Sequence, residues 1–156
     1  KGCTEDGTCE NSQWGIVGDT FIVGCQIPDT IVFPEFNSLN SDNFDKLGIY
    51  SKNIGLNNVY CSFGHDEYLY QLLKFNKVDL PTEAYYMIRF HSLYLWHDKN
   101  EYAFLENDND KKYKSYVKLF NKYDLYTKDK NKKNIDQLKL YYRKLINKFI
   151  PEYIYW

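Results

Sequence analysis

The stretch Gly64-His65-Asp66-Glu67-Tyr68 decides the fold, because a run with helical periodicity begins inside it. His65 and the apolar residues Tyr68, Leu69 and Leu72 are spaced i, i+3, i+4 and i+7. That period is typical of an amphipathic α-helix. We expect the helix to run to about Asn76, with acidic residues near its start that cap it and face solvent.

Two further periodic segments each end on a residue that can bind a metal ion. The first begins at Pro81, a residue tolerated in a first helical turn, and its apolar stripe ends on His91. The second follows the N-cap cluster 107–110, and its stripe ends on Asp124. The stripes predict that His65, His91 and Asp124 all point inward, where polar groups are costly unless they are paired or bound.

A shared metal site would explain these three inward side chains together. Each one taken alone has a simpler explanation, since a buried histidine is more often hydrogen-bonded in a core and an aspartate more often caps a helix or forms an ion pair. If both histidines bind one ion at about 2.1 Å, their ligating nitrogens should lie roughly 3–4 Å apart.

The composition fits one domain of 156 residues with a formal net charge of −1. Such a balance gives no field that draws the chain to nucleic acid or to an anionic membrane. Neither a signal peptide nor an apolar run that could cross a bilayer is visible. We therefore expect a cytoplasmic monomer with reduced thiols, although Cys3 and Cys9 could pair with each other.

The rest of the sequence predicts a loose segment at 1–12, an irregular segment with one or two short extended pieces at about 13–36, and a surface loop at 34–46. A short helix is expected near Leu56 to Phe63. A final helix should span about Ile135 to Phe149, on the stripe Leu138, Tyr142, Leu145 and Phe149, and end before Pro151. The expected fold class is an all-α bundle that occupies residues 13–156.

Several ordered strings are far more specific than periodicity. They are Trp14-Gly15-Ile16-Val17-Gly18-Asp19-Thr20-Phe21, Val23-Gly24-Cys25, Gly64-His65-Asp66-Glu67-Tyr68, Lys74-Phe75-Asn76-Lys77, Tyr86-Met87-Ile88-Arg89-Phe90-His91-Ser92 and Phe120-Asn121-Lys122-Tyr123-Asp124-Leu125-Tyr126-Thr127-Lys128. With these strings the chain resembles the myo-inositol oxygenase family from about Gln13 to Trp156, with one shortened loop at 34–46.

The resemblance implies an HD-domain-like helical fold and a site with two iron ions. Enzymes of this family convert myo-inositol and O₂ to D-glucuronate by cleaving a carbon–carbon bond of the ring. By resemblance, His65 and His91 bind one iron and Asp124 binds the other.

The resemblance also implies a set of residues that contact the inositol hydroxyls: Gly18, Asp19, His91, Ser92 and Lys128. From the residues alone, Gly18-Asp19 would be a turn, Ser92 a helix-end hydroxyl and Lys128 a solvated residue in a charged run. His97 is expected beside the metal ligands or on the surface, and outside the ligand set.

The family has three further protein ligands, an upstream histidine and a His-Asp pair, which have no counterpart before His65. The chain starts at Lys1 and its only methionine is Met87, so we expect a fragment or a processed chain. This C-terminal part of the catalytic domain should be inactive alone and should expose an apolar face around the metal site.

Two other functional classes stay open. One is a non-catalytic helical remnant, or pseudoenzyme. The other is an HD-type metal-dependent phosphohydrolase, which would need phosphate-binding basic residues around the site. Gly18-Asp19 argues against the phosphohydrolase.

Overall fold

The computed structural model describes residues 20–124 and 134–156, and these are mainly helical. The α-helices in the described ranges are α2 (His65–Phe75), α3 (Thr82–Phe90), α4 (Tyr94–His97), α5 (Asp108–Asp124) and α6 (Ile135–Phe149). The expected all-α class is therefore confirmed. None of these helices combines the length and the apolar character that crossing a bilayer requires.

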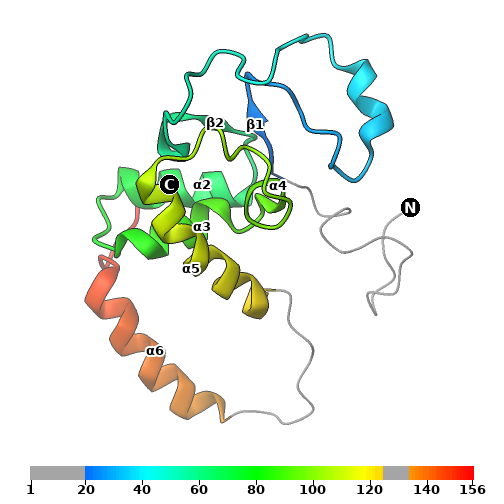
Figure 1. Ribbon diagram of the computed structural model, residues 1–156. Helices are drawn as coiled ribbons and strands as arrows, with labels where there is room; N and C mark the ends of the chain where they lie inside the picture. Colours follow the sequence, from blue (N-terminus) through cyan, green and yellow to red (C-terminus); the bar gives the residue numbers. More distant parts are fainter. Residues whose placement is uncertain (1–19, 125–133) are drawn as a thin grey trace.

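Helices α2, α3 and α5 pack side by side, with α3 in contact with both of the others (Figure 1). Local sequence sets where they begin. Pro81 precedes the first turn of α3, where its missing N–H costs nothing. Asn107 accepts hydrogen bonds from the backbone N–H groups of Asn109 and Asp110 and so caps the start of α5.

A short antiparallel ribbon lies at one end of this layer. Strand β1 (Ile22–Val23) pairs with β2 (Tyr60–Cys61), with Ile22 opposite Cys61. The predicted extended piece is thus present. In the predicted surface loop, Pro34–Leu39 form the exposed 3₁₀ helix η1.

The prediction of a short helix from Leu56 to Phe63 was wrong. The segment makes only the 3₁₀ turn η2 (Leu56–Asn58) before it enters β2. Long-range bonds explain the difference. Tyr60 donates its N–H to the Tyr50 hydroxyl, Ser62 donates its N–H to the Phe21 carbonyl, and the Val59 carbonyl accepts from Arg89. A helix over 56–63 would have to bond these same backbone groups internally.

The main core lies between the ribbon, α3, α4 and the turn before α5. Its largest fully buried side chains include Phe90, Trp96, Tyr102 and Leu105. A smaller cluster at the far end of α2 and α3 holds Leu73, Val78 and Tyr85, with Ile150 packed against it.

The predicted inward faces of α2 and α3 were assigned wrongly. His65 and Tyr68 on the α2 stripe are exposed, whereas Asp66 and Glu67, which were expected to face solvent, are buried. On α3 the buried residues are Tyr85, Tyr86, Arg89 and Phe90, and the stripe ending on His91 is half-buried. Glu67 and Arg89 form a buried ion pair with each other, so the helix faces that carry them turn to the interior.

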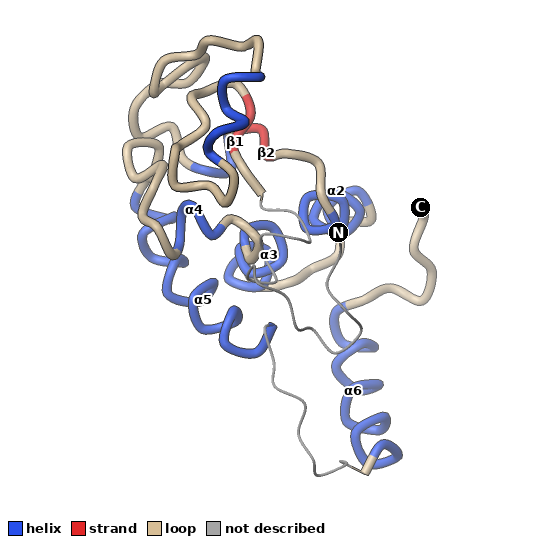
Figure 2. The backbone as a smooth tube through the Cα atoms, turned by 90° about the vertical axis from the view of Figure 1, so that its right-hand side faces the viewer, coloured by secondary structure: helices blue, strands red, loops and turns tan. Residues whose placement is uncertain are grey.

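Helix α6 stands apart from the other helices and contains no buried residue (Figure 2). Its bounds match the prediction, and Asn134 caps it by accepting from the N–H groups of Asp136 and Gln137. The chain after it returns to α2, where Asn76 exchanges hydrogen bonds of 2.9 and 2.8 Å with the backbone of Tyr155.

Candidate functional site

Two histidines from neighbouring helices face each other. His65 is the first residue of α2, and His91 is the C-cap residue of α3. Their Nε2 atoms lie 2.9 Å apart, and their rings meet edge to face with centroids separated by 4.9 Å. The structure therefore brings these two predicted ligands together, at a hydrogen-bond distance just short of the expected range.

Hydrogen bonds define how the two imidazoles share protons. Nδ1 of His91 lies 2.9 Å from the Ile88 carbonyl oxygen, which can only accept, so Nδ1 carries the proton. In the neutral ring this leaves the His91 Nε2 lone pair facing His65. Nε2 of His65 must then donate its N–H across the 2.9 Å gap. A histidine with Nδ1–H on a backbone carbonyl and a bare Nε2 has the arrangement usual for a metal ligand.

Two side chains, one buried and one half-buried, hold the backbone of His91 in place. Its carbonyl accepts from Nε2 of His97 at 2.9 Å and from Nδ2 of Asn121 at 2.7 Å. His97 is 4 % exposed, so it supports His91 and does not lie on the surface. Burial lowers the pKa of His97, against the opposing effect of its bond to the His91 carbonyl.

An ion pair that is almost completely buried joins α2 to α3 directly behind the histidines. Nε of Arg89 donates to Glu67 at 2.6 Å, and Gln71 donates to the same carboxylate at 2.6 Å. Arg89 also donates to the Val59 carbonyl at 3.1 Å. Burial by itself lowers the pKa of Arg89, but the bond to Glu67 and nearby negative charge outweigh it and raise that pKa. The pair holds the two helices in register.

A second buried contact lies on residues next to the histidines. The Asp66 carboxylate accepts from the Thr20 hydroxyl at 2.6 Å, and the Thr20 N–H donates to the Ser92 carbonyl at 3.2 Å. The sequence analysis did not single out Thr20, Arg89 or Asn121. One signal was available for Asn121, which lies three residues before Asp124 and so shares its helix face.

The other predicted site residues have different outcomes. The prediction that Asp124 points inward was wrong, because Asp124 is the exposed last residue of α5. One turn earlier, the Phe120 ring lies 5.8 Å from the His91 ring. Ser92 is 5 % exposed, and within the described ranges its hydroxyl has no hydrogen-bond partner. Gly18, Asp19 and Lys128 lie outside the described residues.

The chemistry of this donor set suits one metal ion only in part. Two imidazole nitrogens converge, and imidazole is a good ligand for iron, zinc and copper. Residues 20–124 and 134–156 contain no group of three or more His, Cys, Asp or Glu side chains that could hold an ion. The two imidazoles could supply only part of a coordination shell, and the metal-binding role of the pair stays a prediction.

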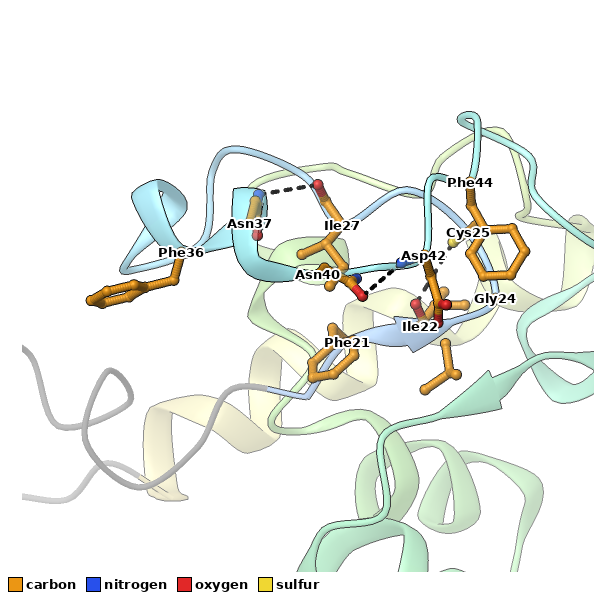
Figure 3. Close-up of a pocket in the computed structure, with 11 residues that line it drawn as sticks. Phe21, Ile22, Gly24, Cys25, Ile27, Phe36, Asn37, Asn40, Asp42 and Phe44 are labelled. Atoms are coloured by element: carbon orange, nitrogen blue, oxygen red, sulfur yellow. Dashed lines mark hydrogen bonds between the residues drawn. The ribbon is translucent and has the colours of Figure 1, made fainter.

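A pocket of about 390 Å³ lies elsewhere, between β1 and the loop that contains η1 (Figure 3). Apolar side chains such as Phe21, Ile27 and Phe44 line most of it, and Asp42 and Asn40 lie among them. Of the predicted site residues that the structure describes, none lines it. The sequence analysis did not predict this pocket, which forms where the segment 21–27 meets the loop residues 36–44.

The fold and the histidine pair together define an all-α protein in which two imidazoles from adjacent helices meet. The family model for myo-inositol oxygenase matches residues 7–156. Inositol oxygenase from Dictyostelium discoideum is 48 % identical over 152 residues, which cover 94 % of this chain and 52 % of the relative. The chain belongs to the myo-inositol oxygenase family.

Two vertebrate relatives match with similar identity and coverage. Inositol oxygenase from Danio rerio is 45 % identical, with 92 % of this chain and 54 % of the relative covered. Inositol oxygenase from Homo sapiens is also 45 % identical, with 92 % and 53 % covered. The chain spans about half the length of the curated relatives it matches.

Proposed function

We propose that this chain forms part of an inositol oxygenase, which converts myo-inositol and O₂ to D-glucuronate. The observation that carries the proposal is the pair His65 and His91, whose Nε2 atoms lie 2.9 Å apart in a chain of this family. The proposal is also supported by the relatives, which bear the name inositol oxygenase. The substrate and reaction follow from family membership and the resemblance described above.

In this proposal, His65 and His91 bind one iron ion and Asp124 contributes to a second. The bare Nε2 of His91 supports this assignment for His91. To bind through Nε2, neutral His65 must move its proton from Nε2 to Nδ1, because the metal ligand is a neutral imidazole. When bound, a pair of metal ions supplies Lewis acidity and a place to hold O₂ and substrate oxygens together. The remaining ligands must come from residues that are not among those the structure describes.

The residues that would contact the polyol are Gly18, Asp19, His91, Ser92 and Lys128. The buried Ser92 hydroxyl supports this part of the proposal, since it has no hydrogen-bond partner within residues 20–124 and 134–156 and buried hydroxyls normally have one. Its backbone is held by Thr20, so the hydroxyl belongs to a fixed segment.

The experiment compares this chain with the complete product of the gene that encodes it. Each is given Fe²⁺, a reductant, O₂ and myo-inositol, and D-glucuronate is measured. We expect turnover by the complete product. The isolated chain should bind the metal weakly and form no glucuronate, because two imidazoles and one exposed carboxylate cannot hold two ions close together.

A matched pair of variants tests the site in the complete product. His91→Ala should abolish glucuronate formation while sparing the fold, because it removes a ligand at the end of α3. Lys111→Ala, which removes only an exposed ion pair with Asp108, should leave turnover unchanged. Turnover by the isolated chain would contradict the ligand count. Lack of turnover in a complete, iron-loaded product would favour the non-catalytic alternative.

A further inference from the structure

Thr20 contacts both segments that carry the histidine pair. Its hydroxyl donates to Oδ2 of Asp66, the residue after His65, at 2.6 Å. Its backbone N–H donates to the carbonyl of Ser92, the residue after His91, at 3.2 Å. Thr20 and Asp66 are 4 % and 1 % exposed, so water does not compete for the hydroxyl–carboxylate bond.

The Asp66 carboxylate is fixed on its other side by the start of α2. Its Oδ1 accepts from the N–H of Glu67 at 2.8 Å. The carboxylate folds back over Gly64, where a Cβ would lie only 2.9 Å from Oδ1. This leaves Oδ2 for Thr20. Removing the Thr20 hydroxyl would leave Oδ2 of Asp66 buried without a hydrogen-bond donor. Such an unsatisfied charged group costs more free energy than the loss of an ordinary hydrogen bond.

Thr20 is itself held in place by the segment that follows it. The Phe21 N–H donates to the Ser62 hydroxyl at 3.2 Å, and the Ser62 N–H donates to the Phe21 carbonyl at 2.8 Å. Next along the chain, β1 pairs with β2 at Ile22. The hydroxyl of Thr20 therefore acts from a fixed backbone and can fix the residues that it contacts.

We propose that Thr20 is a positioning residue for the histidine pair. By bonding the residues next to His65 and His91, it sets the approach of the two Nε2 atoms and so preorganises the metal-binding half-site. The inference rests on the proposed function in one respect, which is that this pair binds a metal ion. The approach of the two imidazoles can be measured without metal.

The test compares three variants of this chain. Thr20→Val removes the hydroxyl and keeps the shape, whereas Thr20→Ser keeps the hydroxyl. Thr30→Val is the matched control, because Thr30 also donates to a carboxylate, that of Glu101 at 3.0 Å, but at an exposed position away from the histidines. Circular dichroism at the assay temperature selects conditions in which every variant is folded.

Two measurements are made on each variant. The first is the affinity for Co²⁺, followed by its visible absorption. The second is the ¹⁵N spectrum of the imidazole nitrogens without metal, which reports whether His65 Nε2 still donates to His91. We expect Thr20→Val to weaken Co²⁺ binding about tenfold, the effect of one hydrogen bond to a charged group, and to lose the imidazole hydrogen bond. Thr20→Ser and Thr30→Val should retain both properties.

The outcomes separate the two proposals. If the unsubstituted chain binds no Co²⁺, the prediction that this chain alone binds a metal ion weakly fails, and the imidazole spectrum still decides the role of Thr20. If folded Thr20→Val keeps an unchanged imidazole spectrum, the positioning role is refuted, whatever the metal affinity. If Thr30→Val has the same effect as Thr20→Val, the effect is not specific to the pair, and the role is likewise refuted.

Discussion

Cys61 lies in β2, directly opposite Ile22 of β1, and is 9 % exposed. Burial raises the pKa of its thiol to about 12, and the nearby Arg89 charge opposes this only in part. A thiol with so high a pKa is protonated at neutral pH. Since thiolate is the reactive form, Cys61 should be inert to thiol reagents in the folded chain.

This raised pKa predicts how stability depends on alkaline pH. The unfolded thiol ionises near its ordinary pKa of 9.0, while the folded thiol keeps its proton up to about 12. The folded state therefore holds more protons between these values. Its contribution to stability is complete below pH 9 and is lost as pH rises. Going from pH 8 to pH 10 should cost about 1 kcal/mol from this group.

The measurement is urea unfolding of the chain and of Cys61→Ala at pH 8 and pH 10. Cys61→Ala will be less stable at both pH values because it loses buried volume. Between pH 8 and pH 10, however, its free energy of unfolding should fall by about 1 kcal/mol less than that of the unsubstituted chain. Cys25, whose pKa burial raises to about 11, is present in both proteins and cancels in the comparison. Equal losses in the two proteins would show that the Cys61 thiol is not shielded.

At the scale of elements, the link between α2 and α3 depends on Glu67 and Arg89. Glu67→Leu would leave the Arg89 guanidinium buried without its partner, at 5 % side-chain exposure. We expect the free energy of unfolding to fall by about 3–5 kcal/mol, as is typical when one member of a buried pair is removed. Urea or thermal unfolding measures this loss.

Two further variants test whether the unpaired charge is the cause. The double variant Glu67→Leu with Arg89→Met should recover much of the lost stability, because no buried charge remains. Lys111→Ala, which removes the exposed pair with Asp108, should cause no measurable change. A double variant that is as unstable as the single one would assign the loss to packing instead.

Element boundaries were largely predictable from the sequence, whereas the orientation of the helices was not. Pro81, the N-cap cluster before α5 and the stripe of α6 located these helices to within a few residues. Periodicity shows only that a helix has an apolar side. It cannot show that Glu67 meets Arg89 of another helix and that this pair turns inward.

The elements that were missed depend on distant partners. Strand β2 exists because residues 22–23 pair with it, and α4 follows directly after the Leu93 turn with only four residues. Neither has a periodic pattern long enough to detect. At the site, the family strings pointed to His65 and His91, and the spacing to Asp124 offered a signal for Asn121, but nothing local indicated that Thr20 would hold the segments that carry the histidines.

At the scale of the whole molecule, large apolar side chains lie exposed on three helices. They include Tyr68 and Leu69 on α2, Tyr116 and Leu119 on α5, and Leu138, Tyr142 and Leu145 on α6. Those on α2 lie beside His65, and those on α5 lie on the helix whose Phe120 contacts His91. The sequence predicted an exposed apolar face around the site, and these side chains are consistent with it. Soluble monomers rarely leave a large apolar patch uncovered.

The last prediction is that the folded chain binds the dye ANS, which fluoresces on exposed apolar surface. Near-ultraviolet circular dichroism must show fixed aromatic packing in the same sample, since a molten state would also bind the dye. Replacing Leu138 and Leu145 by Lys should lower the fluorescence, because both belong to the continuous stripe of α6. Leu140→Lys is the control, since Leu140 is 65 % exposed but lies off that stripe. An equal effect of Leu140→Lys, or no ANS signal from the folded chain, would show that the stripe is not an open apolar face. A smaller signal per molecule from the complete gene product would show that other residues cover it there.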